Sequence, residues 1–411
     1  MTTEVHAASE HRSASSTGAS VHSRREITIV GAGIAGLCAA ICCAEAGLSV
    51  SLLEAHERVG GRARSTDGPF KANLGPHAMY SDGPFWAWLS ERDLLPPHAS
   101  PRLSAIRMRI DGKLKRTPPL QLLPAVLRLR GREAPVELDF RSWAARHAGD
   151  SVACMLSSIA GVFTYHHDPG SLSAAFVWPR MQRGLAIRTP VRYPVNGWSS
   201  LVDELERRAR GLGVCLQTGA HVQQLPEAPV IVATELSEAA RLIGDGGLRW
   251  PGGKTLCLDL GLRRGEGDPT VVSDFDEAGW IGRYSAANRS VAPEGHELIQ
   301  AQMPMRPNES AEQASLRLRR LLDISLQDWQ GRETWRRRQV MDRRSGAIEL
   351  PGFTWRERPA IDQGGGVFLA GDMVAAPGML AEVSWASAVE ASRLALAHVS
   401  AAKGRLLRKA A

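Results

Sequence analysis

The sequence has few of the residues that build metal centres and disulfide frameworks. Its 411 residues include six cysteines, which form neither a C-x-x-C pair nor a Cys/His cluster with zinc spacing. This argues against a structural zinc site and against a disulfide-stabilised secreted fold. We therefore expect no metal ion and a cytoplasmic protein.

Long hydrophobic runs and catalytic constellations are also missing. The apolar segment after Arg25 is interrupted by glycines and by Glu45, which argues against a transmembrane helix or an export signal there. No Ser/His/Asp set and no pair of carboxylates stands at a recognisable catalytic spacing. The net charge of +7 and the 44% hydrophobic content suit an ordinary globular protein, and the length suffices for two domains.

The most informative pattern that is present lies in residues 27–54. It predicts a strand, a glycine turn, a helix and a second strand that ends at Glu54. Gly31 permits the tight turn, Gly33 lets a pyrophosphate approach the backbone, and Gly36 lets the helix pack closely on the strand. Glu54 is placed to accept hydrogen bonds from an adenosine ribose. The segment therefore predicts a dinucleotide-binding βαβ unit.

Two further motifs narrow the choice of dinucleotide. Residues 57–62 read ERVGGR, and residues 366–372 read GVFLAGD, about 340 residues after the first motif. In this order the three motifs resemble those of FAD-containing oxidoreductases. That superfamily includes the amine oxidases, protoporphyrinogen oxidase and the phytoene desaturases. The resemblance extends from about residue 27 to residue 397, most loosely in the middle.

The resemblance implies an α/β fold with two domains. A Rossmann-like FAD-binding domain of the GR2 type, arranged as in p-hydroxybenzoate hydroxylase, would be combined with a mixed α+β substrate domain. We expect FAD-binding segments at 26–99, 196–248 and 351–400, substrate or cap segments at 100–195 and 249–350, a disordered extension at 1–25 and a basic, frayed tail at 401–411.

The resemblance also implies which residues hold the cofactor, as non-covalently bound FAD. The related enzymes that attach flavin through cysteine carry it shortly before the terminal helix, and no cysteine follows Cys257 here. In the family the Asp of the third motif bonds the ribityl chain, and the next helix, predicted here from about residue 380 to 398, points its N-terminus at the flavin ring. The implied set is Gly31, Gly33, Ile34, Ala35, Gly36, Glu54, Ala55, Arg58, Gly60, Gly61, Arg62, Gly75, Pro76, His77, Val222, Thr234, Gly371, Asp372, Met379, Leu380 and Ala381.

Two residues are candidates for catalysis. His77 follows a Gly-Pro pair in a segment that passes close to the flavin in the family, where we favour a structural role or a hydrogen bond to the flavin edge over general base work. Lys254 stands near the position of a lysine that holds a water beside flavin N5 in amine oxidases. Ser384 falls where we place the tyrosine of the amine oxidase cage, which favours a desaturase-like reaction.

The middle of the chain carries weaker signals. Helices are expected at about 85–95, 120–130, 139–163 and 199–214, and short strands at 214–218, 220–222, 229–234 and 255–260. The apolar and basic segment 118–132 fits a helical cap over the active site, with a surface that sits on a membrane as the alternative. Residues 165–168, with two adjacent histidines, are interpreted as a loop.

The implied reaction transfers a hydride equivalent from a C–H bond of a small or medium apolar metabolite to flavin N5 and leaves C=C or C=N. Electrons would then pass to oxygen, a quinone or another acceptor, and no nucleic-acid partner is expected. Three alternatives stay open: an amine oxidase that produces an imine and hydrogen peroxide, a non-catalytic FAD-binding protein, and an NAD-dependent dehydrogenase.

Overall fold

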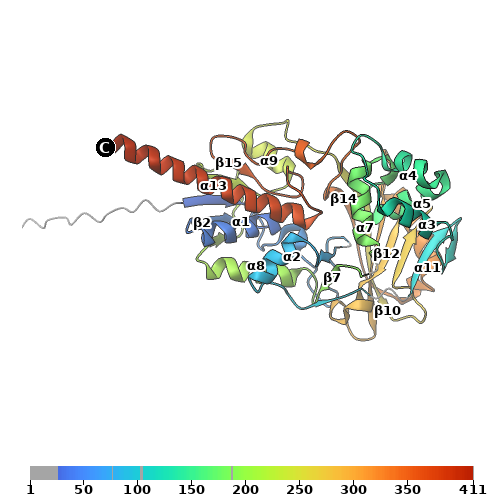
Figure 1. Cartoon of the computed structure of the whole chain (residues 1–411). Helices are drawn as coiled ribbons and strands as arrows, with labels where there is room; N and C mark the ends of the chain where they lie inside the picture. The colour runs from blue at the N-terminus through green and yellow to red at the C-terminus, as the bar shows by residue number, and fades with distance from the viewer. Residues whose placement is uncertain (1–25, 76, 102–104, 187, 411) are drawn as a thin grey trace, which may run out of the picture.

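A five-stranded parallel sheet forms the part of the molecule that contains the first glycine motif (Figure 1). The structure is a computed structural model and describes residues 26–75, 77–101, 105–186 and 188–410, so the expected extension 1–25 and Pro76 lie outside the described residues. In spatial order the strands are β15 (Val367–Leu369), β9 (Val230–Val232), β1 (Glu26–Val30), β2 (Ser49–Leu53) and β8 (Cys215–Gln217).

Three helices share one apolar core with this parallel sheet, and each contributes small or branched apolar residues to it. Helix α1 (Ile34–Glu45) is apolar on nearly all sides and packs against α8 (Ser199–Gly211) and α13 (Ala381–Ala410) as well as the sheet. The side chains of α8 that face this core lie at 201, 202, 205 and 209, the spacing of an amphipathic helix. The predicted strand-helix-strand order is confirmed. The predicted helix 199–214 is confirmed as far as Gly211, where α8 ends.

The last helix is longer than predicted. We expected it to end near residue 398 and the tail to fray, whereas α13 continues to Ala410. The tail is rich in Ala, Leu, Lys and Arg, which all favour the helical state. Figure 1 shows this C-terminal end of α13 reaching beyond the rest of the molecule.

A seven-stranded mixed sheet forms the other half (Figure 1). The long strand β10 pairs antiparallel with both β13 and the edge strand β14, and β5 is parallel to β11. In spatial order the strands are β14 (Glu333–Ala347), β10 (Gly252–Arg263), β13 (His296–Pro304), β12 (Trp280–Arg283), β11 (Val271–Asp274), β5 (Ile106–Ile110) and β6 (Lys113–Lys115). A small sheet of β3 (Met79–Tyr80), β7 (Val191–Pro194) and β4 (His98–Ala99) completes the strands.

A group of helices forms a cap with its own apolar core, which includes Phe140, Leu156 and Trp178. The helices are α3 (Leu122–Arg130), α4 (Phe140–Ala148), α5 (Asp150–Ile159), α6 (Gly161–Thr164) and α7 (Ala174–Gly184). The prediction for 120–130 is confirmed, and the predicted helix 139–163 is broken at Gly149, which adopts a φ of 83°. Residues 165–168 form the predicted loop.

The predicted apolar and basic segment presents three leucines to the surface. Leu120, Leu123 and Leu127 are 93%, 66% and 57% exposed, at and beside α3. Within the residues that the structure describes, none of the helices combines the length and the apolar character needed to span a bilayer.

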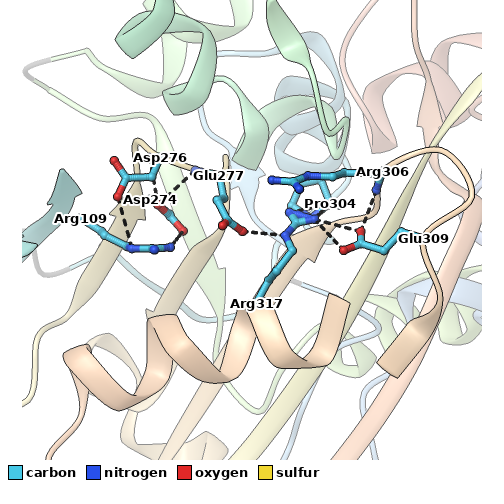
Figure 2. Close-up of polar contacts among 8 residues, drawn as sticks. All are labelled: Arg109, Asp274, Asp276, Glu277, Pro304, Arg306, Glu309 and Arg317. Carbon is cyan, nitrogen blue, oxygen red and sulfur yellow. Dashed lines mark hydrogen bonds and ion pairs between the residues drawn. The ribbon is translucent and has the colours of Figure 1, made fainter. Parts of the chain in front are cut away.

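Helix α11 (Ala311–Ser325) is fixed to the seven-stranded sheet by a buried charge cluster as well as by apolar contacts. Arg317 donates to Glu277 at 2.6 Å, to Glu309 at 2.9 Å and to the carbonyl of Pro304 (Figure 2). Ser310 and Gln313 close the start of the helix with a reciprocal capping box. The side chain of Arg317 is 8% exposed, so its charge depends on these acids.

The other helices are short connectors. They are α2 (Pro84–Glu91), α9 (Leu236–Ile243), α10 (Tyr284–Ala287) and α12 (Trp329–Arg332), with 3-10 turns η1 (Gly61–Ala63), η2 (Pro169–Ser171), η3 (Arg289–Val291) and η4 (Trp355–Glu357). One predicted strand is wrong: residues 220–222 form no ladder, because β8 ends at Gln217 and the chain turns at Gly219, with a φ of 67°.

Candidate cofactor site

The first glycine motif forms the turn between β1 and α1. Gly31 has a φ of 97°, and a Cβ there would lie 2.7 Å from the carbonyl oxygen of Ala233. A Cβ on Gly36 would meet the backbone of Gly31, so close packing requires both glycines. Gly33 differs, because no atom lies within 4 Å of a Cβ built on it. The space in front of Gly33 and the first turn of α1 is therefore open to a ligand.

Glu54 supports this glycine turn directly. Glu54 is 6% exposed. Its carboxylate accepts hydrogen bonds from the backbone N–H of Ala32 at 2.8 Å and of His56 at 3.0 Å. The ring of His56 is 2.8 Å from the same carboxylate. Each carboxylate oxygen has two lone pairs, so Glu54 retains acceptor sites for ribose hydroxyls.

The second motif lies against the first. The N–H of Gly60 donates to the carbonyl of Ala32 at 2.7 Å, and Gly60 and Gly61 have φ values of 108° and 51°. The 3-10 turn after Gly60 directs Arg62 toward the third motif, where it forms a two-pronged ion pair with Asp372. Burial opposes the charge on Arg62, but the carboxylate of Asp372 still raises the pKa of the guanidinium.

These three motifs line one pocket of about 990 Å³, at the upper end of the size of cofactor sites. Most residues predicted to bind the cofactor line it: Gly31, Gly33, Ile34, Ala35, Glu54, Ala55, Arg58, Gly60, Gly61, Arg62, Gly75, His77, Val222, Thr234, Gly371, Asp372, Leu380 and Ala381. Two do not. Gly36 packs behind the turn, and Met379 is buried beside it.

Lys254 does not belong to the pocket. Successive side chains of a strand point to opposite faces, and Thr255 and Cys257 on β10 line the pocket whereas Lys254 does not. Its ammonium is 44% exposed and lies 3.8 Å from the carboxylate of Asp342. The predicted position was one residue out of register, so we assign Lys254 no role in catalysis.

His77 lines the pocket, and its imidazole is uncharged at neutral pH. Burial, together with the positive charge of Arg62, lowers the pKa of His77 to about 4. The ring is edge-on to Trp198 at 5.7 Å. A neutral imidazole can accept or donate a hydrogen bond, which agrees with the predicted contact to the edge of a bound ring.

The wall opposite the glycine motifs was not predicted. It consists of side chains from the seven-stranded sheet and the cap, namely Tyr165, Thr255, Cys257, Arg337, Met341, Arg344 and Ser345. Ser384, which the sequence analysis singled out, lines the same pocket from α13. Alternate residues of a strand face the same side, so the predicted strand 255–260 indicates that Thr255 and Cys257 share a face. The sequence around Arg337 does not indicate that it lines the pocket, because its place depends on the pairing of β14 with β10 across almost eighty residues.

A buried polar network holds this wall against the segment that contains His77. The carboxylate of Asp259 accepts from Arg337 at 2.7 Å and from the amide of Gln300 at 2.8 Å. Gln300 also donates to the carbonyl of Asn73 at 3.0 Å. The network therefore fixes the distance between the substrate side and the cofactor side of the pocket.

The residues present fit a bound FAD. The open cradle at Gly33 lies at the N-terminus of α1, where free N–H groups favour phosphates. Asp372 pairs with Arg62 and lines the same pocket as that cradle, so one elongated ligand would touch all three motifs. Burial raises the pKa of the Cys257 thiol well above its ordinary value, which disfavours the reactive thiolate. Across the described residues, no three His, Cys, Asp or Glu side chains gather as a metal site.

Comparisons with known proteins agree with this site. The model of the NAD(P)-binding Rossmann-like domain matches residues 29–91. An L-amino acid oxidase of Crotalus durissus cumanensis is 55% identical over 53 residues, 13% of this chain and 11% of the relative. A carotenoid 3,4-desaturase of Haloarcula japonica is 50% identical over 56 residues, which cover 13% of this chain and 11% of the relative. The chain thus spans about a tenth of the length of these curated relatives.

Solved structures share the whole fold at low sequence identity. An oxidoreductase from Methanosarcina mazei matches with a TM-score of 0.73 and 15% identity over 89% of this chain and 99% of the other. Cyclohexylamine oxidase from Brevibacterium oxydans matches with a TM-score of 0.67 and 12% identity over 92% of this chain and 100% of the other. This chain thus shares its fold, a Rossmann-like parallel sheet with a second sheet, with these two proteins. The local sequence matches and the shared fold agree with the resemblance that the three motifs carry.

Proposed function

We propose that the protein is an FAD-dependent oxidoreductase that removes a hydride equivalent from a C–H bond of a small metabolite and leaves C=C or C=N. One observation carries the proposal. The three motifs, which extend from Gly31 to Asp372 and so span 341 residues of chain, line a single pocket whose opposite wall comes from the second sheet and the cap. A cofactor and a substrate can therefore face each other there.

FAD, held non-covalently and in the GR2-type arrangement, would supply the hydride acceptor at flavin N5. The turn at Gly33 and the first turn of α1 would bind the pyrophosphate, Glu54 the ribose, and Asp372 the ribityl chain. The substrate would lie against Thr255, Cys257 and Met341. Arg337, neutralised by Asp259, would keep that wall in place and limit access of water. Oxygen or a quinone would reoxidise the cofactor.

The first test is the visible absorption spectrum of the purified protein, recorded before and after anaerobic addition of candidate substrates. Bands near about 370 and 450 nm that bleach with one substrate are the expected result. A colourless protein that does not take up FAD would overturn the proposal and favour a nicotinamide dehydrogenase. A flavin that no substrate reduces would favour the non-catalytic alternative.

The alternative within the same fold is an amine oxidase. It is supported by the overlap in fold with a cyclohexylamine oxidase. The tyrosine of the amine cage is absent at Ser384, which lines the pocket. Hydrogen peroxide formed stoichiometrically with simple amines would favour the oxidase, whereas its absence together with flavin bleaching by a non-amine would favour the desaturase-like reaction.

A further inference from the structure

Helix α3 of the cap has two apolar faces, and only one of them is buried. Ala125 and Leu129 pack into the core of the cap. Leu123 and Leu127, one helical turn apart, are exposed to solvent, and the equally exposed Leu120 lies in the turn that leads into the helix. Single surface leucines are ordinary, but three within eight residues form an apolar patch, and such patches mark interaction surfaces. These three residues are called the leucine patch below.

Basic side chains flank the leucine patch in the chain. Residues 112–132 contain six Lys and Arg residues and no Asp or Glu. Only Lys115 forms an ion pair within the described part of the chain, at 3.8 Å from Asp111. The other five basic side chains are therefore free to meet an external anion. All six are exposed, namely Lys113, Lys115, Arg116, Arg128, Arg130 and Arg132.

The acids of the cap lie outside this segment. Asp139 and Asp150 are at the starts of α4 and α5, and Asp276 lies at the turn between β5 and β6, where it pairs with Arg109 (Figure 2). Over residues 111–159, which include α3, α4 and α5, eight Lys and Arg stand against five Asp and Glu. Salt confines the field of an exposed charge to about 8 Å, so the charges beside the leucines, rather than the balance of the whole cap, decide what this surface attracts.

An anionic bilayer matches this surface better than a protein partner does. Protein interfaces are enriched in aromatic residues and depleted in Lys, whereas residues 112–132 contain no Phe, Trp or Tyr. Helices that lie on a membrane combine Leu with Lys and Arg. Pro118 and Pro119 lack a backbone N–H, so fewer donors lose water when the turn at Leu120 enters a lipid surface. Figure 1 shows α3 at the edge of the molecule, where a flat surface can reach it.

We propose that the leucine patch and the basic residues of 112–132 bind the surface of a membrane that contains anionic lipids. The leucine side chains would enter the apolar side of the headgroup layer, and the Lys and Arg side chains would lie among the lipid phosphates. The inner face of α3 would stay in the core of the cap, so the protein would bind from one side of the bilayer without spanning it. The proposal does not depend on the chemistry of the cofactor pocket.

The test is cosedimentation of the purified holoprotein with vesicles of phosphatidylcholine alone or of phosphatidylcholine and phosphatidylglycerol in equal parts. We expect binding to the anionic vesicles that weakens at high salt, and little binding to the neutral ones. Leu123→Gln combined with Leu127→Gln should lower the partition coefficient by roughly tenfold or more, because two apolar side chains no longer leave water. Arg116→Gln combined with Arg130→Gln should lower it by roughly tenfold through lost attraction to the lipids. All four side chains are exposed, so these variants should fold.

The matched controls change the same residue types outside the segment. Leu350→Gln replaces another exposed leucine, in the loop after β14. Arg207→Gln combined with Arg210→Gln removes two exposed arginines from α8, beside the parallel sheet. Both controls should keep the partition coefficient of the original protein. Equal losses in the patch and control variants, or equal binding to neutral and anionic vesicles, would overturn the proposal.

A second copy of the chain is the other occupant that the test can reveal. It predicts a dimer in light scattering that Leu123→Gln combined with Leu127→Gln converts to a monomer, together with no binding to either kind of vesicle. That result would overturn the proposal and assign the leucine patch to a protein interface.

Discussion

Arg62 and Asp372 are 310 residues apart in the chain and form a two-pronged ion pair, with N–O distances of 2.7 and 2.8 Å. The pair joins the second motif to the third across the expected cofactor site. Arg62 also donates to the carbonyl of Arg344 at 2.9 Å, so the same side chain reaches the end of β14. Three distant segments of the chain thus meet at one guanidinium.

This pair should contribute to folding as well as to cofactor retention. In a double-mutant cycle with Arg62→Met and Asp372→Asn, we expect a coupling of about 1 to 2 kcal/mol in the free energy of unfolding, because both side chains are mostly shielded from water. Urea titrations of the four proteins measure it. Both single variants should also retain less FAD after gel filtration.

The second motif offers a matched control. Arg58 forms an equally short pair with Asp67, but the two side chains are 49% and 73% exposed. Solvent screens such pairs, so the same cycle with Arg58→Met and Asp67→Asn should give no measurable coupling. Equal coupling in the two cycles would mean that the position of Arg62 at the pocket has no special effect on stability.

Glu54→Gln should weaken FAD binding by roughly tenfold, because a charge-assisted hydrogen bond to ribose is replaced by a neutral one. The variant also loses part of the acceptor capacity for the N–H of Ala32, so the glycine turn should become less rigid. Flavin fluorescence during titration of the apoprotein measures the affinity. Glu57→Gln is the control, since Glu57 is exposed three residues further on. An unchanged affinity in Glu54→Gln would remove Glu54 from the site.

The cofactor side of the pocket was predictable because its information is local. Gly31 and Gly36 are needed by the turn in which they occur, and the strand and helix periods beside them are clear in the sequence. Glu54 follows from the length of one βαβ unit. These constraints need no knowledge of how distant segments pack.

The substrate side was not predictable for the opposite reason. Whether Lys254 or Thr255 faces the pocket depends on a one-residue register within β10, and a slip of one residue exchanges the two faces of a strand. Arg337 lines the pocket beside Thr255 and Cys257 because β14 pairs with β10, from which it is separated by about seventy residues of chain. The spacing of residues in the chain does not encode that proximity.

The buried Arg317 cluster should be essential for the stability of the second sheet. Arg317→Met leaves Glu309, whose side chain is 7% exposed, without its main partner, so we expect a loss of about 3 kcal/mol in the free energy of unfolding. Urea denaturation followed by circular dichroism measures it. Arg320→Met on the exposed face of the same helix should stay within about 0.5 kcal/mol of the original protein. Similar losses in both variants would show that net charge, rather than the cluster, governs stability.

The burial of His77 should make stability fall at acid pH. The pKa of His77 is lowered to about 4, against an ordinary value near 6.5 in an unfolded chain. Between these values the unfolded chain binds a proton that the folded protein does not, so acid favours unfolding. From pH 6.5 to 4.5 the contribution of His77 to the free energy of unfolding should fall by about 2 kcal/mol.

His77→Gln removes this proton uptake, so its stability should decline less steeply over the same interval. Urea titrations of the cofactor-free protein at several pH values measure the two slopes. His221→Gln serves as the control, because His221 is an exposed residue at the rim of the same pocket and its replacement should leave the slope unchanged. If the free energy of unfolding depended on pH in the same way in the original protein and in His77→Gln, the acid sensitivity would belong to other groups. That result would contradict the conclusion that this imidazole is buried in its neutral form.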